Sequence, residues 1–255
     1  MISLNSGRTI ILVAVRLKSK RLKNKAFLPI MGKTMINILY NRLLNVRNAK
    51  KIVLCTSTNK QDDPIYHFAK KNNILCVRGS ELNVISRFLK AAKLHKAKNV
   101  VRVTGDNPLT DPKMIDKMIL NHKKNNSDYT YCDQIPNGTR SEVISTKALE
   151  FCLKNVRYPN NSEYMTWMLN RPDIYKVNII KIKNKKIKYP NLNFTVDNKN
   201  EYLNIVRIFK HFNSNDFSLE ELIKYVISNK KYLKDYKLKK SKGMHSINIK
   251  YKFEK

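Results

Sequence analysis

The sequence predicts an α/β fold in which a doubly wound, mostly parallel sheet is covered by helices on both faces. From residue 9 to about residue 122, apolar runs of strand length alternate with segments whose apolar residues recur at helical spacing. This alternation is typical of βαβ units, in which parallel strands pair beneath crossover helices. The chain has 255 residues, 42% of them hydrophobic and 9% aromatic, which suffices for the core of one large domain.

The first half of the chain contains the clearest alternation. Its strand-like runs are Thr9–Val15, Lys51–Cys55, Ile74–Val77 and Asn99–Thr104. Its helix-like segments are Met35–Val46, Asp63–Lys71, Val84–Leu94 and a fourth from Pro112 to about His122. Asp111 precedes that proline. An aspartate that caps free backbone N–H groups, followed by a proline at the first helical position, indicates the start of a helix.

The second half is less regular. Its strand candidates are Asp128–Cys132, Glu142–Ser145, Tyr175–Lys188 and Leu192–Val196. Its helix candidates are Thr146–Val156, Ser162–Leu169, Glu201–Phe212 and a last one that ends near Ser228 and begins with the capping box Ser218–Glu221. We expect residues 1–228 to form a single domain and the lysine-rich residues 229–255 to form a basic, peripheral tail.

The charge of the chain is its most unusual bulk property. The sequence contains 51 Lys and Arg against 19 Asp and Glu, a formal net charge of +32. Such a balance favours polyanionic partners. The cations are spread over the whole length among many Asn and Ile residues, however, which indicates a biased composition more than one binding face. We therefore expect no specific nucleic-acid partner.

The sequence contains neither the long apolar run of a membrane helix nor the cysteine spacing of a metal or redox motif. No run of about 18 apolar residues is present, so we expect no membrane insertion, and the polar residues 1–8 lack the layout of a secretory signal. The four cysteines are widely spaced, with no Cys-x-x-Cys pair: Cys55, Cys76, Cys132 and Cys152. Buried free thiols in a reducing compartment are the expected state, and the expected location is cytoplasmic.

A basic loop follows the first predicted strand. Its cations are Arg16, Lys18, Lys20, Arg21, Lys23 and Lys25. Open α/β sheets bind ligands at the carboxyl ends of their strands, so this loop is placed to hold a polyphosphate. On the local sequence alone, a solvated basic loop is an equal alternative.

Two aspartates follow later strand candidates. Asp106 comes after Asn99–Thr104 and a glycine, and Asp197 comes directly after Leu192–Val196. A carboxylate at such an edge can bind a hard divalent cation, which in turn binds phosphate oxygens. Each aspartate alone fits a helix cap or a turn better. Together with the basic loop, the pair predicts a metal–nucleotide site.

These motifs, taken in order, resemble those of the sugar cytidylyltransferases. That family makes CMP-activated sialic-acid-type (acylneuraminate) and Kdo-type sugars, and the spore-coat polysaccharide type is the most similar branch. Arg16–Lys25 is similar to the family signature Ala-Arg-x-x-Ser-x-Arg-Leu-Pro-Gly-Lys. The later blocks keep the family order: Cys55–Ser57, Arg78–Glu81 with Arg87-Phe88, Thr104–Leu109, Pro136–Gly138 with Glu142-Val143, Glu163 with Thr166, and Thr195–Asp197. The resemblance extends from about Thr9 to Phe212.

The resemblance implies a nucleotide-diphospho-sugar transferase-like fold, commonly homodimeric, and transfer of CMP from CTP to an acceptor with release of pyrophosphate. It implies a catalytic set of Arg16, Lys25, Asp106 and Asp197, in which the two cations hold the triphosphate and the two aspartates bind Mg²⁺. Further nucleotide contacts are implied for Ser19, Arg21, Thr56, Ser57, Arg78, Arg87 and Thr104. Acceptor contacts are implied for Glu142 and Glu163.

Three departures from the family pattern bear on the prediction. Lys23-Asn24 replaces Pro-Gly, and Asn tolerates the left-handed conformation that this turn requires. Tyr164 stands where the spore-coat branch often has histidine, and Arg140 where it often has aspartate. Because the change to Arg140 inverts the local charge, we expect an anionic acceptor that carries a carboxylate, phosphate or phosphonate.

The sequence therefore predicts a Mg²⁺-dependent cytidylyltransferase that activates an acidic sugar or similar acceptor for surface-glycan synthesis. Three alternatives stay open at this point: an enzyme of the same fold that uses another NTP, a basic nucleic-acid-binding protein without catalysis, and a non-catalytic family member. The presence of both Asp106 and Asp197 argues against the last.

Overall fold

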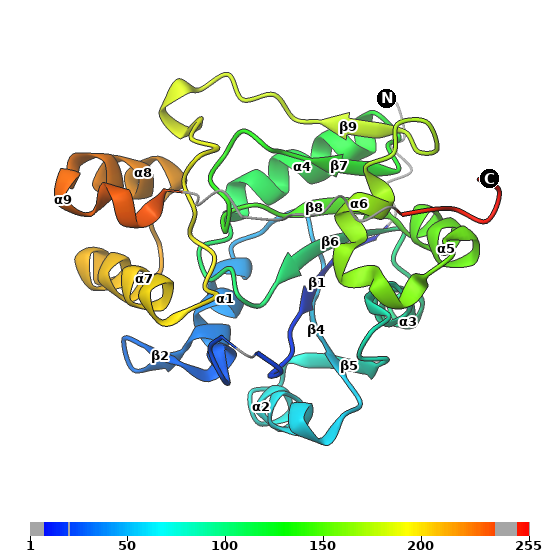
Figure 1. The fold of residues 1–255 in the computed structure, drawn as a ribbon, viewed down its shortest axis with the longest axis horizontal. Coiled ribbons are helices and arrows are strands. Elements are labelled where there is room, and N and C mark those ends of the chain that lie inside the picture. Colours follow the sequence, from blue (N-terminus) through cyan, green and yellow to red (C-terminus); the bar gives the residue numbers. More distant parts are fainter. Residues whose placement is uncertain (1–7, 20, 238–248, 255) are drawn as a thin grey trace.

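The structure, a computed structural model, describes residues 8–19, 21–237 and 249–254. Its centre is a seven-stranded sheet with the strand order β5-β4-β1-β6-β8-β7-β9 (Figure 1). The strands are β1 (Thr9–Ala14), β4 (Ile52–Ser57), β5 (Leu75–Gly79), β6 (Asn99–Thr104), β7 (Tyr129–Tyr131), β8 (Glu142–Ser145) and β9 (Val177–Ile179). A second, two-stranded sheet contains β2 (Pro29–Ile30) and β3 (Lys33–Thr34).

The sheet is mostly parallel, as the sequence predicted. β1 pairs in parallel with β4 and β6, and β4 pairs in parallel with β5. β8 is antiparallel to both of its neighbours, β6 and β7, whereas β9 is parallel to β7. The doubly wound α/β class is confirmed, and the single reversed strand, β8, lies between the parallel strands of the first half and the strands β7 and β9.

Helices connect the strands and cover the sheet (Figure 1). The α-helices are α1 (Met35–Leu43), α2 (Asp63–Lys71), α3 (Val84–Leu94), α4 (Pro112–Lys124), α5 (Thr146–Asn155), α6 (Met165–Leu169), α7 (Lys199–Phe212), α8 (Leu219–Ser228) and α9 (Lys230–Leu233). The 3₁₀ helices are η1 (Lys25–Phe27), η2 (Lys60–Asp62), η3 (Pro159–Tyr164), η4 (Lys185–Ile187) and η5 (Lys234–Tyr236). The predicted caps are present, because Asp111 accepts a hydrogen bond from the backbone of α4 and Ser218 and Glu221 form a capping box at α8.

The two faces of the sheet bury separate apolar clusters. In β1, Ile11 and Val13 belong to the cluster beneath α1, α4 and α7, whereas Ile10 and Leu12 belong to the cluster beneath α3, α5 and α6. Successive side chains of a strand point to opposite faces, so a strand covered on both faces must be apolar at every position. This explains why the strand-like runs of the first half were easy to recognise.

The second half of the chain differs from the prediction. The strand predicted over Leu192–Val196 is wrong: this segment is extended but forms only isolated bridges, one of them between Asn137 and Asn193. Of the predicted strand Tyr175–Lys188, only Val177–Ile179 pairs, at the edge of the sheet. The backbone of Leu192–Val196 bonds to residues of distant loops, such as Asn137. Local sequence does not specify the positions of those loops.

The C-terminal segment also differs from the expected peripheral tail. Tyr236 and Tyr251 are 1% and 0% exposed and belong to the two apolar clusters. The Tyr251 hydroxyl lies 2.7 Å from the hydroxyl of Tyr175 and donates to the Met168 carbonyl at 2.8 Å. The described parts of residues 229–255 therefore contribute to the core. In the part of the chain that the structure describes, no helix has the length and apolarity needed to cross a bilayer.

All four cysteines are free thiols, as predicted. Cys55, Cys132 and Cys152 are buried, and Cys76 is half-buried. Burial raises the pKa of each thiol above its ordinary value.

Candidate active site

The candidate site lies at the carboxyl ends of β1 and β6, the two central parallel strands. Ala14 and Thr104 face each other in register at the ends of these strands, and the Gly105 N–H donates to the Ala14 carbonyl at 2.8 Å. A Cβ atom on Gly105 would lie 2.9 Å from the Cβ of Val15. Glycine at this position therefore lets the loops that follow β1 and β6 begin side by side.

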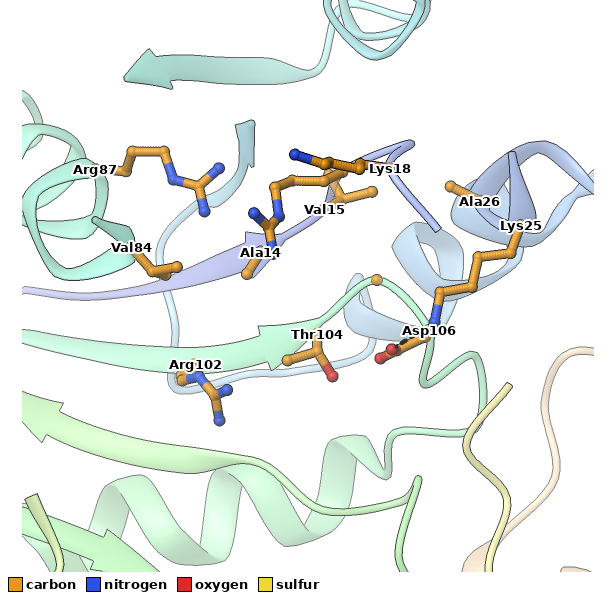
Figure 2. Close-up of a pocket in the computed structure, with 12 residues that line it drawn as sticks. Ala14, Val15, Lys18, Lys25, Ala26, Val84, Arg87, Arg102, Thr104 and Asp106 are labelled. Atoms are coloured by element: carbon orange, nitrogen blue, oxygen red, sulfur yellow. Dashed lines mark hydrogen bonds and ion pairs between the residues drawn. The ribbon is translucent and has the colours of Figure 1, made fainter. Parts of the chain in front are cut away.

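A pocket of about 290 Å³ opens between these loops and the start of α3 (Figure 2). Its charged lining residues are Arg16, Lys18, Lys25, Arg87, Arg102 and Asp106. Cations thus outnumber carboxylates in the lining. A concave site with this charge balance attracts a polyanionic ligand.

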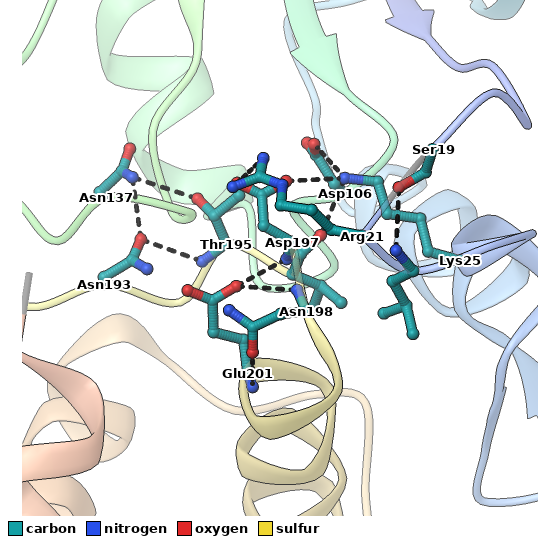
Figure 3. Close-up of polar contacts among 12 residues, drawn as sticks. Ser19, Arg21, Lys25, Asp106, Asn137, Asn193, Thr195, Asp197, Asn198 and Glu201 are labelled. Carbon is teal, nitrogen blue, oxygen red and sulfur yellow. Dashed lines mark hydrogen bonds and ion pairs between the residues drawn. The ribbon is translucent and has the colours of Figure 1, made fainter. Parts of the chain in front are cut away.

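Lys25 joins the two predicted metal-binding aspartates. Its Nζ donates to Asp106 Oδ2 at 2.8 Å, to Asp197 Oδ1 at 3.0 Å and to the Val196 carbonyl at 2.9 Å (Figure 3). Arg21 Nη2 lies 3.0 Å from the other oxygen of Asp197. Burial opposes the charge of Lys25, but the two carboxylates outweigh it and raise the pKa of the ammonium group above its ordinary value. The fold thus brings residues 25, 106 and 197 into one cluster.

The turn at Asn24 has the left-handed conformation that the sequence predicted. Asn24 adopts a left-handed backbone conformation with φ 52°, so it supplies the turn that glycine forms in the family signature. Ser19 Oγ accepts a hydrogen bond from the Leu22 N–H at 3.2 Å. The turn at Asn24 leads into η1, which begins with Lys25.

Asp197 reaches the site from a segment that is not a strand. The Val196 N–H donates to the Asp106 carbonyl at 2.9 Å, which ties this segment to the loop after β6. The Glu201 carboxylate accepts from the Asp197 N–H at 2.7 Å and from the Asn198 N–H at 3.1 Å (Figure 3). Backbone contacts and the start of α7 therefore hold the second carboxylate.

Arg16 and Lys18 share an acidic partner, Glu81, which belongs to the Arg78–Glu81 motif but had no predicted role. Arg16 Nη1 donates to the Glu81 carbonyl at 3.1 Å, and Lys18 Nζ lies 2.9 Å from Glu81 Oε1. The hydrogen bond from Lys18 is the main cause that holds the pKa of Glu81 below its ordinary value. Glu81 links the basic loop to the segment between β5 and α3.

Arg87 is the most deeply buried cation of the pocket, with 1% of its surface exposed. Its Nε and Nη1 atoms have no hydrogen-bond partner among the described residues. Burial lowers the pKa of this guanidinium below its ordinary value. A Cβ atom on Gly79 would lie 2.7 Å from Arg87 Cγ, so the glycine provides the space that this side chain occupies.

Other predicted nucleotide contacts lie outside the pocket lining. Thr56 and Ser57 are buried at the end of β4, and Ser57 Oγ donates to Asp62. Arg78 Nε donates to the Ser57 carbonyl at 2.9 Å, and its Nη2 lies 2.6 Å from Asp63 Oδ1. Their role toward a nucleotide stays a prediction. Thr104, by contrast, does line the pocket.

The predicted acceptor residues Arg140 and Glu142 do not line the pocket. Arg140 Nε donates to the Ile135 carbonyl at 2.7 Å and its Nη2 to the Pro190 carbonyl at 3.4 Å, outside the pocket lining. Its acceptor role therefore stays a prediction without a place in the pocket. The Glu163 side chain lies outside the described part of the structure.

Sequence reasoning missed Arg102. This residue lines the pocket from β6, and its Nη1 lies 2.9 Å from Glu142 Oε2 on the neighbouring strand β8. The signal was a cation inside the otherwise apolar run Val100–Val103. A charge in a central strand requires a compensating partner, which sequence alone does not identify.

The carboxylate pair fits a hard divalent cation. Asp106 and Asp197 already hold one cationic group between them, the Lys25 ammonium. No group of three or more His, Cys, Asp or Glu residues suited to a metal occurs among residues 8–19, 21–237 and 249–254. Mg²⁺ commonly uses one or two protein carboxylates and takes its other ligands from phosphate and water, so two carboxylates suffice as its protein ligands.

A parallel sheet edge that combines a basic loop, a cationic pocket and a carboxylate pair defines a nucleotide-handling α/β protein. The chain belongs to the cytidylyltransferase family, whose sequence profile matches residues 10–235. It is therefore a nucleotidyltransferase, and the resemblance stated from its motifs is confirmed.

Individual relatives agree with this assignment. An uncharacterised protein of Methanocaldococcus jannaschii is 31% identical over 219 residues, which are 86% of this chain and 90% of that protein. The spore coat polysaccharide biosynthesis protein SpsF of Bacillus subtilis is 29% identical over 83% of this chain and 91% of its own length. The 3-deoxy-manno-octulosonate cytidylyltransferase of Escherichia coli is 24% identical over 62% of this chain and 67% of its own length.

A solved structure shares the fold. A cytidylyltransferase from Leptospira borgpetersenii superimposes with a TM-score of 0.80 at 24% identity, and the match covers 93% of this chain and 100% of that one. The arrangement of strands and helices described above is thus that of a known nucleotidyltransferase fold.

Proposed function

We propose that this protein transfers CMP from CTP to an acidic sugar or similar anionic acceptor, with release of pyrophosphate, for surface-glycan synthesis. The observation that supports it most is the convergence of Lys25, Asp106 and Asp197 in a cationic pocket of a cytidylyltransferase-family chain. A triphosphate and a divalent cation are the ligands whose charges complement this cluster.

In the proposed reaction, an acceptor oxygen attacks the α-phosphorus of CTP in line and pyrophosphate leaves. Arg16 and Lys25 hold the triphosphate and neutralise the charge that develops on the departing pyrophosphate. Glu81 orients Arg16 and Lys18, since both cations contact it. The protein contributes mostly by positioning the reactants, as is usual for phosphoryl transfer.

Asp106 and Asp197 would hold Mg²⁺, which when bound supplies charge neutralisation to phosphate oxygens. Because the Lys25 ammonium lies between the same carboxylates, it competes with a divalent cation in the absence of nucleotide. We expect Lys25→Met to bind Mn²⁺ about tenfold more tightly than the unmodified protein without CTP, and Asp106→Asn to bind it more weakly. Electron paramagnetic resonance of free Mn²⁺ measures both. Unchanged affinity in both variants would count against the metal site.

The acceptor proposal is supported by two relatives and by the charge of the pocket. One relative is named for spore coat polysaccharide biosynthesis and another for cytidylyl transfer to 3-deoxy-manno-octulosonate, an acidic sugar. The pocket lining of this chain is cationic. An acceptor that carries an anionic group complements such a pocket.

The proposal is tested by pyrophosphate release. The protein is incubated with Mg²⁺, with each of CTP, UTP, ATP and GTP, and with a panel of keto-acid sugars and neutral sugars. We expect release with CTP and an acidic acceptor. Release with another NTP would identify an enzyme of the same fold with a different base preference. No release with any NTP, together with salt-sensitive RNA binding, would overturn the proposal.

We also propose a homodimer in the cytoplasm. Free thiols at all four cysteines suit a reducing compartment. Exposed aromatic side chains at Phe151, Trp167 and Phe253 suit an interface with a second copy of the chain. Light scattering over a range of concentrations tests the dimer, and a constant monomer mass would contradict it.

A further inference from the structure

We propose that Arg102 binds the anionic group of the acceptor and that Glu142 and Thr166 hold Arg102 in position. This inference rests on the proposed function and deepens it, because it names the residue that recognises the anionic group of the acceptor. It assigns to Arg102 the role that the sequence suggested for Arg140, whose guanidinium is bound to backbone carbonyls.

The strand β6 places Arg102 in line with the reaction site. Residues two apart in a strand point to the same face, and both Arg102 and Thr104 line the pocket. Asp106 follows in the turn after the strand and also lines it (Figure 2). An acceptor that lies along this strand with its reacting oxygen near Asp106 has its other substituents within reach of Arg102.

Arg102 lies apart from the cations assigned to the triphosphate. Arg16, Lys18 and Lys25 belong to the loop after β1. Arg102 belongs to β6 and pairs with β8, and Figure 2 shows it on the opposite side of the β1–β6 pair from Lys18 and Arg87. The cations of the pocket lining thus come from both sides of the β1–β6 pair, and we assign the Arg102 side to the acceptor.

A cation at position 102 lowers the stability of the fold unless it has an acidic partner, because the position is mostly buried. Val100, which points to the same face of β6, packs into the apolar cluster beneath α3 and α5. Arg102 occupies the next position on that face, with 16% of its side chain exposed. Burial opposes its charge, yet Glu142 outweighs this effect and raises the pKa of the guanidinium above its ordinary value. The charge is therefore permanent at any physiological pH.

Glu142 contacts Arg102 but does not line the pocket. Its Oε2 accepts from Arg102 Nη1 at 2.9 Å, and its Oε1 accepts from Thr166 Oγ1 at 2.5 Å. Glu142 is absent from the pocket lining, whereas Arg102 is part of it. The ion pair thus presents its positive member to a ligand. A carboxylate or phosphate forms a charge-assisted hydrogen bond with the Arg102 guanidinium, whereas a neutral hydroxyl forms only a weaker one.

Steady-state kinetics with paired acceptors tests the inference. The acceptors are 3-deoxy-manno-octulosonate and N-acetylneuraminate, each compared with its own carboxamide. The variants are Arg102→Gln and Arg102→Lys, with Thr166→Val to loosen the support without removing the cation. Lys186→Gln is the control, because Lys186 also pairs with a glutamate, Glu220, outside the pocket lining.

We expect Arg102→Gln to raise KM for the acidic acceptor by about 10- to 100-fold, the range for loss of a charge-assisted hydrogen bond. KM for CTP should change less than threefold, and the preference for acid over carboxamide should disappear. Arg102→Lys should restore part of that preference. Thr166→Val should raise acceptor KM by a smaller factor, with CTP binding unchanged. The control should match the unmodified protein in all three values.

Two results would overturn the inference, and they are distinguishable. If the unmodified protein is active with an acidic acceptor and Arg102→Gln keeps its acceptor KM and its acid preference, Arg102 has no role in recognition. If Arg102→Gln fails to fold, unchanged acceptor KM in Thr166→Val leads to the same conclusion. If the unmodified protein releases pyrophosphate with no acceptor in the panel, the proposed function fails together with this inference.

Discussion

At the scale of single residues, the structure sorts the cations of the basic loop. Lys25 contacts both aspartates, Arg21 contacts one of them, and Arg16 contacts Glu81. Lys23 is exposed and lines no part of the pocket. Among its described residues, the loop therefore contains cations with defined acidic partners and an exposed lysine, Lys23, that lines no part of the pocket. Sequence composition could not separate the two groups.

This distinction predicts different effects for two neighbouring lysines. Lys25→Ala should lower kcat/KM for CTP by about 100-fold or more, because it removes charge neutralisation of the triphosphate and leaves two carboxylates facing each other. Pyrophosphate release at low and at saturating CTP measures the effect. Lys23→Ala, in the same loop, is the control and should stay within twofold. Normal turnover of Lys25→Ala would contradict the central assignment of the site.

A buried histidine predicts a pH dependence of stability. His122 of α4 is 2% exposed, and its Nδ1 lies 2.9 Å from Thr130 Oγ1. Burial lowers its pKa to about 4 from 6.5, against an opposing effect of Asp128 and with a small addition from Lys123. Below pH 6.5 the unfolded chain binds the proton more readily, so the free energy of unfolding falls as the pH drops toward 4.

We expect urea unfolding to show a loss of about 2 kcal/mol between pH 7 and pH 4.5 that is attributable to this residue. His122→Asn keeps a polar group near Thr130 and cannot titrate. The unmodified protein should therefore lose about 2 kcal/mol more than the variant over this range. Parallel pH profiles for the two proteins would contradict a neutral buried histidine.

At the scale of elements, a tight loop contact positions the second carboxylate. Gly138 has φ 81°, and a Cβ atom there would lie 2.4 Å from the Phe194 carbonyl carbon and from the Thr195 nitrogen. The Phe194 N–H donates to the Asn137 carbonyl at 2.9 Å, which ties the two segments together. The loop at residues 136–138 thus sets the path of the segment that ends in Asp197.

Gly138→Ala should therefore damage both stability and activity. Pushing backbone against backbone at a positive φ should lower the free energy of unfolding by about 3 kcal/mol, and displacement of Asp197 should lower kcat. Gly32→Ala is the matched control, since Gly32 has φ 73° but nothing within 4 Å of an added Cβ. It should cost about 1 kcal/mol and leave kcat unchanged. Equal effects of the two substitutions would show that the contact is unimportant.

At the scale of the whole molecule, the C-terminal segment closes one apolar cluster. Tyr251 is fully buried against Tyr175 and Met168, and Arg171 contacts Glu254 a few residues later. Residues far apart in the sequence thereby fix the end of the chain against α5 and α6. Since α6 carries Thr166, which contacts Glu142, the packing of this segment is connected to the support of the pocket.

Removal of the buried tyrosine should therefore destabilise the fold. Tyr251→Ala should lower the free energy of unfolding by about 4 kcal/mol, as for other large buried aromatic residues. Tyr158→Ala removes an aromatic side chain that is 66% exposed, and it should cost less than about 1 kcal/mol. Denaturant unfolding followed by circular dichroism measures both. A small effect at Tyr251 would restore the expectation of a peripheral tail.

Local sequence specified the sheet of the first half and predicted three residues that the fold brings into one cluster. Apolar runs such as Asn99–Thr104 belong to strands buried on both faces, and this requirement is visible locally. The family motifs identified Lys25, Asp106 and Asp197 because their order along the chain is preserved.

The partners of the remaining side chains depend on the folded arrangement of the chain. That arrangement placed Arg102 in the pocket and Arg140 on backbone carbonyls, extended Leu192–Val196 without a strand, and buried Tyr251. The physical reason is that a long polar side chain takes whichever partner lies within reach, and that partner comes from a distant part of the chain. Local pattern specifies the periodicity of an element, whereas only packing specifies its neighbours.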